Sequence, residues 1–302
     1  MTRHLAIDAG QTGIRTRVID DGIRAPEGEL PGILTSQPLM PQLAAVIRGA
    51  SSSRVDVVSI GSTGLIAEQT DPAGLRMLVA DLGVTQVLMA HDSVTSYLGA
   101  LGDQRGAVVA AGTGVVTLAV GAHDVARVDG WGNLIGDAGS GYWIGRAALD
   151  AVMRDHDGRG AATALTAVVT ADFPDIEQAY IELQADPGRV RRIAGYARAV
   201  AELAAEGDPV ASTICAGAAH ELAHSISAAL MRVGEADRPD PVVCGMGGVL
   251  RADVIAGPFA AELRRRWERV DIRTPLGSGI DGAALLPAVA ADSALFGLIA
   301  RA

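Results

Sequence analysis

Residues 5–19 read LAIDAGQTGIRTRVI, in which a short apolar run ends at Asp8 and an alternating stretch begins at Ile14. Short apolar runs and period-two alternation are typical of β-strands. The intervening turn is rich in glycine, which adopts the backbone angles that tight turns require. The segment therefore predicts a β-hairpin with Gly10-Gln11-Thr12 at its turn.

The same pattern returns at residues 107–120, where two apolar strands flank the turn Gly112-Thr113-Gly114. Each hairpin opens a run of alternating strand and helix patterns. Such repetition predicts an α/β protein with two duplicated lobes that face one cleft. All hairpins need turn residues, so a chance resemblance between the two is the alternative.

Further elements follow from apolar periodicity. We expect strands at residues 55–60, 86–91 and 241–244, and helices at 71–82, 92–101, 147–154, 163–171, 176–184, 190–205, 209–233 and 279–300. No low-complexity linker separates the two halves, so we expect the lobes to be closely joined.

Charge and composition exclude several functions. The 302 residues carry a net charge of −10, which argues against a nucleic-acid partner, because phosphate backbones are bound by basic surfaces. All 25 basic residues are arginine, so the chain has no Walker-A, Schiff-base or protein-kinase lysine. A phosphate site here must use backbone N–H groups, hydroxyls and a metal ion.

The expected compartment is the cytoplasm. The two cysteines, Cys215 and Cys244, form neither a zinc knuckle nor a redox Cys-x-x-Cys motif. The N-terminus leads directly into a strand pattern, which predicts no signal peptide. The long uncharged runs, residues 30–47 and 106–122, are both shorter than the roughly 20 residues of a membrane-spanning helix.

The first hairpin is a candidate phosphate site. A turn with Gly10 and Thr12 at its tip directs several N–H groups into one small volume, and a hydroxyl adds a donor. Asp8, at the end of the preceding strand, is suited to hold Mg²⁺ directly or through water. The second hairpin strengthens this hypothesis, because two such turns can clamp one polyphosphate.

Asp92 directly follows a predicted strand and begins a predicted helix. From the residues alone, a plain N-cap role is the first interpretation. The alternative is a general base that takes a proton from a hydroxyl as it attacks phosphorus.

Residues 130–145 read GWGNLIGDAGSGYWIG, and this glycine density predicts neither a helix interior nor an ordinary core strand. An aromatic plane beside a carboxylate, as Trp131 and Asp137 offer, suits a sugar ring with several hydroxyls. A tight structural loop is the alternative.

Two other motifs carry less weight. His220-Glu221-Leu222-Ala223-His224 matches the His-Glu-x-x-His pattern of zinc peptidases, but the His-x-x-Gly-x-x-His continuation is absent, so a third ligand would have to be Glu235 or Glu262. The turn Gly245-x-Gly247-Gly248 follows a strand, yet position 250 is Leu where a dinucleotide fold needs glycine.

Together these segments resemble the N-acetylglucosamine kinases and related BadF/BadG-type ATPases of the sugar kinase/actin superfamily. The matching segments occur in the family's order over nearly the whole chain: Asp8-x-Gly10-x-Thr12, Met89 to Asp92, Gly112-Thr113-Gly114, Gly130-Trp131-Gly132 through Gly136-Asp137-x-Gly139-Ser140, Val243 to Val249, and Gly282 to Leu285.

The resemblance implies an actin-like ATPase fold of two ribonuclease-H-like lobes with a nucleotide cleft between them. The first lobe would comprise residues 1–106, completed by a C-terminal helix at about 286–302, and the second residues 107–285. The implied reaction is phosphorylation of an amino sugar by Mg²⁺–ATP, with N-acetylglucosamine 6-phosphate as the expected product. A homodimer is what the family suggests.

The resemblance also assigns roles. Asp92 becomes the catalytic base, and Asp8 becomes the metal ligand. Trp131, Asp137 and the flanking Gly130 and Gly132 would bind the sugar. The nucleotide would be held by Asp8, Gly10, Gln11, Thr12, Gly112, Thr113, Gly114, Ala194, Gly245, Gly247 and Gly248.

Four features depart from the family pattern. Gln11, Val115 and Ala138 replace the usual Gly, Ser and Glu, and the chain's one asparagine, Asn133, is not in an N-terminal sugar-binding loop. The altered Gln11, Val115 and Ala138 positions leave a nucleotide-binding regulator of the same fold as one alternative to an active kinase. The other alternative is a zinc hydrolase that uses the motif residues His220, Glu221 and His224.

Overall fold

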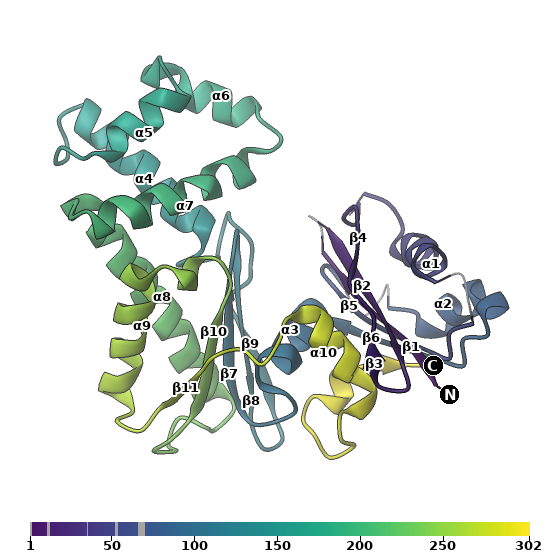
Figure 1. Cartoon of the computed structure of the whole chain (residues 1–302). Coiled ribbons are helices and arrows are strands. Elements are labelled where there is room, and N and C mark those ends of the chain that lie inside the picture. The colour runs from purple at the N-terminus through teal and green to yellow at the C-terminus, as the bar shows by residue number, and fades with distance from the viewer. Residues whose placement is uncertain (1, 11–12, 35, 52–53, 66–69) are drawn as a thin grey trace. The chain divides into compact units, whose positions relative to one another are not determined.

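The computed structural model describes residues 2–10, 13–34, 36–51, 54–65 and 70–302. They form two compact units, each with its own sheet (Figure 1) and its own hydrophobic core. The first unit comprises Met1–Arg105, Val120–Val125 and Thr274–Ala302, and the second comprises Gly106–Ala119 and Ala126–Arg273. The prediction of an α/β fold is confirmed.

The sheet of the first unit has the order β12-β6-β5-β1-β2-β3, with β4 also paired to β2. Strands β1 and β2 form the predicted antiparallel hairpin, whereas β1, β5 and β6 run parallel. The strands are β1 (Arg3–Ala9), β2 (Ile14–Asp20), β3 (Ile23–Arg24), β4 (Gly28–Leu30), β5 (Val57–Ser62), β6 (Gln86–His91) and β12 (Ala300–Arg301).

Alternation along β1 divides its side chains between two layers of helices. Leu5 and Ile7 belong to a core shared with α1 (Leu39–Ala50) and α2 (Pro72–Leu78), whereas Ala6 packs with Ile280 and Ala283 of α10 (Gly279–Leu285). Helix α3 (Asp92–Leu101) packs closely against α10.

Glycine makes this close approach of α3 and α10 possible. A Cβ atom at Gly282 would lie 1.7 Å from the carbonyl oxygen of Thr95, and one at Gly99 would lie 2.1 Å from that of Ser278. Backbone therefore packs on backbone where the two helices cross, which fixes α3 and the Asp92 that begins it.

The chain ends differently from the expectation. Residues 286–302, expected to be helical, form two short 3₁₀ turns and the strand β12, which pairs antiparallel with β6. A proline at position 287 lacks the N–H that a continuing α-helix needs.

The sheet of the second unit has the order β11-β10-β7-β8-β9. The predicted strand–turn–strand at residues 107–120 is confirmed as β7 and β8, which are neighbours in this sheet. The strands are β7 (Gly106–Ala111), β8 (Val115–Val120), β9 (Val125–Val128), β10 (Val242–Met246) and β11 (Asp271–Arg273).

One large core of mostly small aliphatic side chains joins this sheet to its helices. With aromatics at only 3% of the sequence, Ala, Val, Leu and Ile fill the interior. Figure 1 shows α8 and α9 beside the sheet and α4 to α7 beyond its strand ends. The helices are α4 (Gly141–His156), α5 (Leu165–Asp172), α6 (Ala179–Ala185), α7 (Arg189–Ala205), α8 (Pro209–Arg232) and α9 (Asp253–Arg266).

Helix α4 corrects the prediction that the glycine-rich segment excludes a helix interior, because it begins inside that segment at Gly141. Ser140 caps the helix by accepting the N–H of Trp143 at 3.2 Å. A Cβ atom at Gly145 would lie 1.8 Å from the carbonyl oxygen of Ile193 on α7, so glycine is required there by packing.

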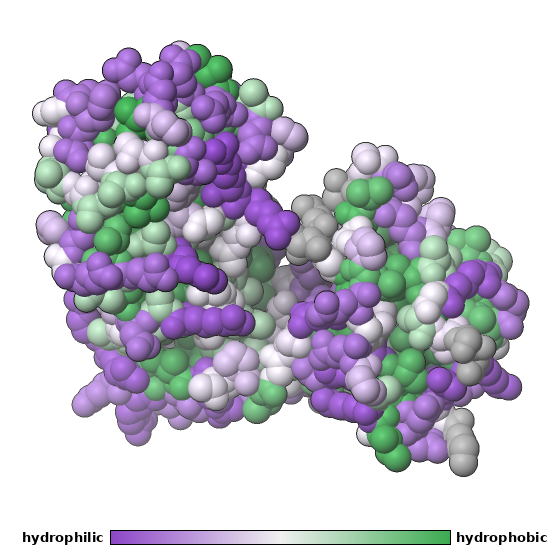
Figure 2. Space-filling view, turned by 45° about the horizontal axis from the view of Figure 1, so that its top comes forward, coloured by the Kyte–Doolittle hydropathy of each residue, from purple (hydrophilic) through white to green (hydrophobic). Residues whose placement is uncertain are grey.

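Hydrophilic side chains cover much of the face shown in Figure 2, with hydrophobic patches between them. None of the helices in the described part of the chain has the length and hydropathy needed to cross a membrane.

Candidate active site

The predicted catalytic base, Asp92, and the predicted metal ligand, Asp8, lie at one edge of the first unit's sheet. Asp8 pairs in register with Gly61 of β5, and Ser62 pairs with His91 at the end of β6. Asp8 and Asp92 are thus placed at the carboxyl ends of β1 and β6, on either side of β5. In α/β sheets, ligands bind beyond the carboxyl ends of the parallel strands.

Asp8 is partly buried and paired with arginine. Arg15 is the residue opposite Asp8 in the hairpin register, and its Nη2 donates a hydrogen bond to Asp8 Oδ2 at 2.5 Å. Burial raises the pKa of Asp8, Arg15 opposes this rise, and the nearby negative charge of Asp92 adds to it. A Cβ atom at Gly279 would lie 2.8 Å from Asp8 Oδ2, so the start of α10 approaches this carboxylate closely.

The N-cap interpretation of Asp92 is wrong, because the structure places His91 at the N-cap and Asp92 in the first helical position of α3. The Asp92 Oδ1 atom lies 2.8 Å from His91 Nδ1. Burial acts to raise the pKa of Asp92, but hydrogen bonds from His91, the Ser93 N–H and Thr63 outweigh burial and lower it. Asp92 is therefore a charged acceptor at neutral pH.

The tip of the first hairpin is described only in part. Gly10 donates its N–H to the carbonyl of Gly13 and accepts from the N–H of Ile33, both at 3.0 Å. Two other predicted nucleotide residues, Gln11 and Thr12, lie outside the described residues.

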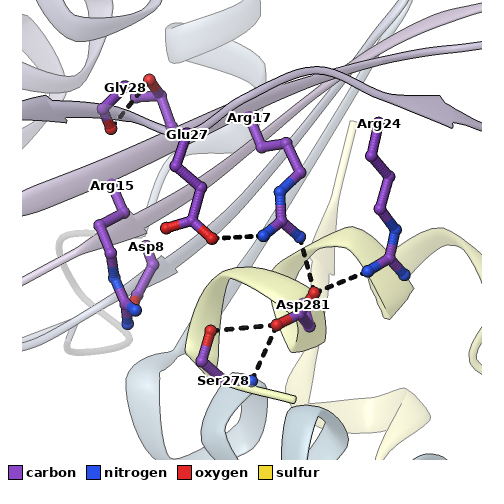
Figure 3. A network of polar contacts seen from close by, with 9 residues as sticks. Asp8, Arg15, Arg17, Arg24, Glu27, Gly28, Ser278 and Asp281 are labelled. Atoms are coloured by element: carbon purple, nitrogen blue, oxygen red, sulfur yellow. Dashed lines mark hydrogen bonds and ion pairs between the residues drawn. The ribbon is translucent and has the colours of Figure 1, made fainter.

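A polar network beside Asp8 was missed by the sequence reasoning (Figure 3). Asp281 on α10 accepts hydrogen bonds from Arg17 at 2.6 Å and Arg24 at 2.7 Å, and from the N–H of Ser278 at 2.9 Å. Arg17 also pairs with Glu27. The Ser-x-x-Asp spacing predicts a helix start at Ser278, but no local signal links Arg17 to a residue near the end of the chain.

In the second unit, the Gly112–Gly114 turn borders a cavity of about 810 Å³. Four of the predicted nucleotide residues line this cavity, namely Gly112, Thr113, Ala194 and Gly248. Gly114, Gly245 and Gly247 are not among the lining residues. Binding pockets for small molecules commonly have volumes of about 300–1,000 Å³.

Helix α4 fixes the turn at the cavity wall. The N–H groups of Gly141 and Tyr142 donate to the carbonyls of Gly112 and Thr113 at 2.8 and 3.0 Å. Three arginines, Arg191, Arg198 and Arg251, also line the cavity, together with Glu202 and Asp253. The cavity lining therefore has one more basic than acidic residue without any lysine.

The predicted sugar residues form one loop, but its aromatic and acidic side chains are exposed to different degrees. Trp131 is 58% exposed, whereas Asp137 is 9% exposed. Burial raises the pKa of Asp137 and the negative charge of Asp129 adds to this rise, whereas the N–H groups of Val115 and Gly132 oppose it. A Cβ atom at Gly114 would lie 2.7 Å from Asp137 Oδ2, so Asp137 links the loop to the Gly112–Gly114 turn.

The structure brings together two residues of the zinc alternative, His220 and the candidate third ligand Glu262. His220 pairs with Glu262, with Nδ1 to Oε2 at 3.1 Å, and its ring centroid lies 6.1 Å from that of His224. Among the described residues, no three His, Cys, Asp or Glu side chains are grouped so as to hold a metal ion. Burial raises the pKa of both Cys215 and Cys244 to about 11, so neither thiol is a reactive thiolate.

Similar proteins support the predicted resemblance. An N-acetylmuramic acid/N-acetylglucosamine kinase of Clostridium acetobutylicum is 27% identical over 79% of each chain, and an N-acetyl-D-glucosamine kinase of Dictyostelium discoideum is 28% identical over 76% of each.

Solved structures share the fold. A candidate N-acetylglucosamine kinase from Chromobacterium violaceum superposes with a TM-score of 0.71 at 24% identity, covering 94% of this chain and 98% of that one. A ROK family glucokinase from Streptomyces griseus, solved with glucose and AMPPNP, gives 0.56 at 20% identity over 94% and 98%. The two-lobed sugar kinase fold predicted from the resemblance is thus confirmed.

The family model of the BadF/BadG/BcrA/BcrD ATPases matches residues 36–287, which is most of the chain. The protein belongs to the BadF/BadG/BcrA/BcrD ATPase family.

Proposed function

We propose that this protein is an ATP-dependent kinase that phosphorylates an amino sugar, with N-acetylglucosamine as the substrate and its 6-phosphate as the product. The observation that carries the proposal is the placement of Asp8 and Asp92 at the carboxyl ends of parallel strands in a member of an ATPase family. The two curated relatives, both named for N-acetylglucosamine, support the choice of sugar.

Asp92 is the proposed general base. Its carboxylate accepts the proton of the sugar's O6 hydroxyl while that oxygen bonds to the γ-phosphorus, and the bond from the γ-phosphorus to ADP breaks. Hydrogen bonds that lower the pKa of Asp92 keep it unprotonated and ready to accept. Positioning and electrostatic stabilisation supply most of the rate enhancement in such transfers.

Asp8 is the proposed magnesium ligand. A carboxylate oxygen at the edge of the sheet is the donor type that Mg²⁺ prefers, and Mg²⁺ commonly uses one or two carboxylates with substrate phosphates. Bound with ATP, the ion would neutralise charge on the phosphates. Arg15 holds the Asp8 side chain at 2.5 Å and so orients it.

The remaining assignments concern binding. Gly10, Gln11 and Thr12 of the first hairpin and the Gly112–Gly114 turn are proposed to bind phosphates. Ala194, Gly245, Gly247 and Gly248 are proposed to border the adenosine, and the 810 Å³ cavity supports this proposal for Ala194 and Gly248. The sugar is assigned to Gly130, Trp131, Gly132 and Asp137.

A coupled ADP-release assay over a panel of sugars tests the function. We expect turnover with N-acetylglucosamine, loss of turnover when EDTA removes Mg²⁺, and weak turnover with glucose. Binding of ATP without ADP release on any sugar would contradict the kinase and favour the nucleotide-binding regulator.

A further inference from the structure

The glycine-rich loop of the second unit has an unusual backbone at both of its ends. Asp129 and Asp137 have φ angles of 58° and 60°, in the left-handed region that non-glycine residues rarely adopt. Such conformations cost about 1–3 kcal/mol each and persist only where surrounding contacts enforce them. In this loop, the contacts that hold the strained backbone come from the Asp129 side chain.

The Asp129 carboxylate binds both ends of the loop. Its Oδ1 accepts the N–H of Gly130 at 2.7 Å and that of Asp137 at 2.8 Å, and its Oδ2 accepts the N–H of Ala138 at 2.9 Å. The Gly130 N–H lies at the start of the loop, and the N–H groups of Asp137 and Ala138 lie at its end. One side chain therefore closes the segment from residue 130 to residue 138.

The loop is folded tightly around this carboxylate. A Cβ atom at Gly136 would lie 2.5 Å from Asp129 Oδ1 and 2.9 Å from the Cβ of Trp131, so only glycine fits at this position. From the neighbouring strand, the Arg127 guanidinium lies 4.8 Å from the centre of the Trp131 ring and donates to the carbonyl oxygens of Asp129 and Gly130.

Three apolar side chains of the closed loop are exposed to solvent. Trp131, Leu134 and Ile135 are 58%, 87% and 85% exposed, although burial would stabilise each of them. Arg127 lies over the indole ring, which nevertheless remains more than half exposed. Exposed apolar groups on a braced loop are typical of ligand-binding surfaces.

We propose that Asp129 is a positioning residue, whose carboxylate holds the loop so that the exposed indole of Trp131 is presented to the sugar. The inference rests on the proposed function, because the sugar assigned to Trp131 comes from it. The closed loop itself is independent of which ligand binds.

Three variants separate the effect of the Asp129 carboxylate from the effect of the backbone strain at position 129. Asp129→Gly removes the carboxylate and leaves φ unstrained, whereas Asp129→Ala removes it and adds strain. Asp129→Asn tolerates the left-handed backbone and keeps one oxygen acceptor, but it turns an amide N–H toward the N–H of Ala138. Asp21→Gly is the matched control: Asp21 also has a positive φ, 46°, and accepts the N–H of Thr2 at 2.8 Å in the other unit.

Amide hydrogen exchange tests the clamp without any substrate. We expect the amides of Gly130, Asp137 and Ala138 to be protected in the wild type and to lose protection in Asp129→Gly but not in Asp21→Gly. Unchanged protection would overturn the clamp. The exchange measurement tests the clamp even if the wild type phosphorylates no sugar. That result would contradict the proposed function but not the clamp.

Kinetics test the positioning role. In Asp129→Gly we expect KM for N-acetylglucosamine to rise about ten- to a hundredfold, with the Kd for ATP unchanged and Asp129→Asn intermediate. A purely structural role would weaken sugar and nucleotide binding together or change neither. Lost amide protection with a wild-type KM for the sugar would overturn the positioning role.

Discussion

The Nδ1 atom of His91 lies 2.8 Å from Oδ1 of Asp92 and 3.2 Å from the backbone nitrogen of Ser93. One ring nitrogen cannot donate to the carboxylate and accept from an N–H at the same time, so the tautomer decides which contact forms. The shorter distance, to a charged acceptor, favours donation to Asp92. His91 thereby orients the proposed base.

Replacing the base tests the centre of the mechanism. Asp92→Asn keeps the size of the side chain but removes its ability to accept a proton, so we expect kcat to fall about 10²- to 10⁴-fold. The Kd for ATP, measured by calorimetry, should stay close to wild type. Substantial ADP release by this variant would remove Asp92 from its role.

His91→Asn separates orientation of the base from capping of the helix. Asparagine is a good N-cap acceptor for the N–H of Ser93, but it offers no ring N–H to the carboxylate. We expect kcat to fall about tenfold with little change in melting temperature.

The matched variant His91→Ala also lacks the ring N–H but offers no cap acceptor, so it should match His91→Asn in kcat and melt lower than His91→Asn by an amount equivalent to about 1 kcal/mol. Equal kcat in wild type and His91→Asn would show that the 2.8 Å contact does not support turnover.

Local patterns were enough to place the two carboxylates. The alternation after Asp8 fixes a hairpin, and the apolar run before Asp92 fixes a buried strand, because both patterns report which side chains face a core. Parallel strands of one sheet present their carboxyl ends at one edge, which brings the two residues near each other.

Other features depend on contacts that no local pattern encodes. Gly145 is helical because its missing side chain admits the backbone of α7, a tertiary reason that overrides helix propensity. Asp129 acts through a left-handed φ and bonds to residues eight and nine positions away, which a sequence does not display.

The tight crossing of α3 and α10 predicts a stability effect. A methyl group at Gly282 would lie 1.7 Å from the carbonyl oxygen of Thr95. Gly282→Ala must therefore separate α10 from α3, at a cost of about 1–3 kcal/mol or more in the free energy of unfolding.

Urea denaturation measures this cost, and Gly297→Ala is the control, since a Cβ atom there meets no other atom within 4 Å. Because α3 begins at Asp92, kcat should also fall in the Gly282 variant. Equal stability of the two variants would contradict the tight crossing.

Asp281 predicts a pH-dependent contribution to stability. Burial alone would raise its pKa, but the Ser278 N–H and Arg17 lower the pKa to about 2. Because this folded-state pKa is depressed, the stabilisation is complete above the ordinary aspartate value near 4 and is lost as the pH falls toward 2. The difference between the folded-state pKa of Asp281 and the ordinary aspartate pKa corresponds to about 2 kcal/mol in the free energy of unfolding.

Asp281→Asn should therefore be less stable than wild type near neutral pH, and the gap should narrow between pH 4 and pH 3 in urea denaturation. Arg24→Gln is the control, because the Arg24 side chain is 55% exposed and its ion pair should contribute less than about 1 kcal/mol. A gap that does not change with pH would refute the electrostatic origin.

The cavity of the second unit predicts a selective loss of nucleotide binding. Ala194 lines this cavity on α7, whereas Ala199 on the same helix does not. A leucine at position 194 would fill space that the proposed adenosine needs, so Ala194→Leu should raise the Kd for ATP about tenfold or more, which corresponds to about 1.4 kcal/mol. Calorimetry measures this directly.

Ala199→Leu is the matched control for the added bulk and should bind ATP like the wild type. The amides of the loop at residues 130–138 should exchange at wild-type rates in both variants, because Asp129 rather than the cavity holds that loop. If both variants lost ATP binding equally, the effect would come from distortion of α7, and the assignment of the cavity to the nucleotide would fail.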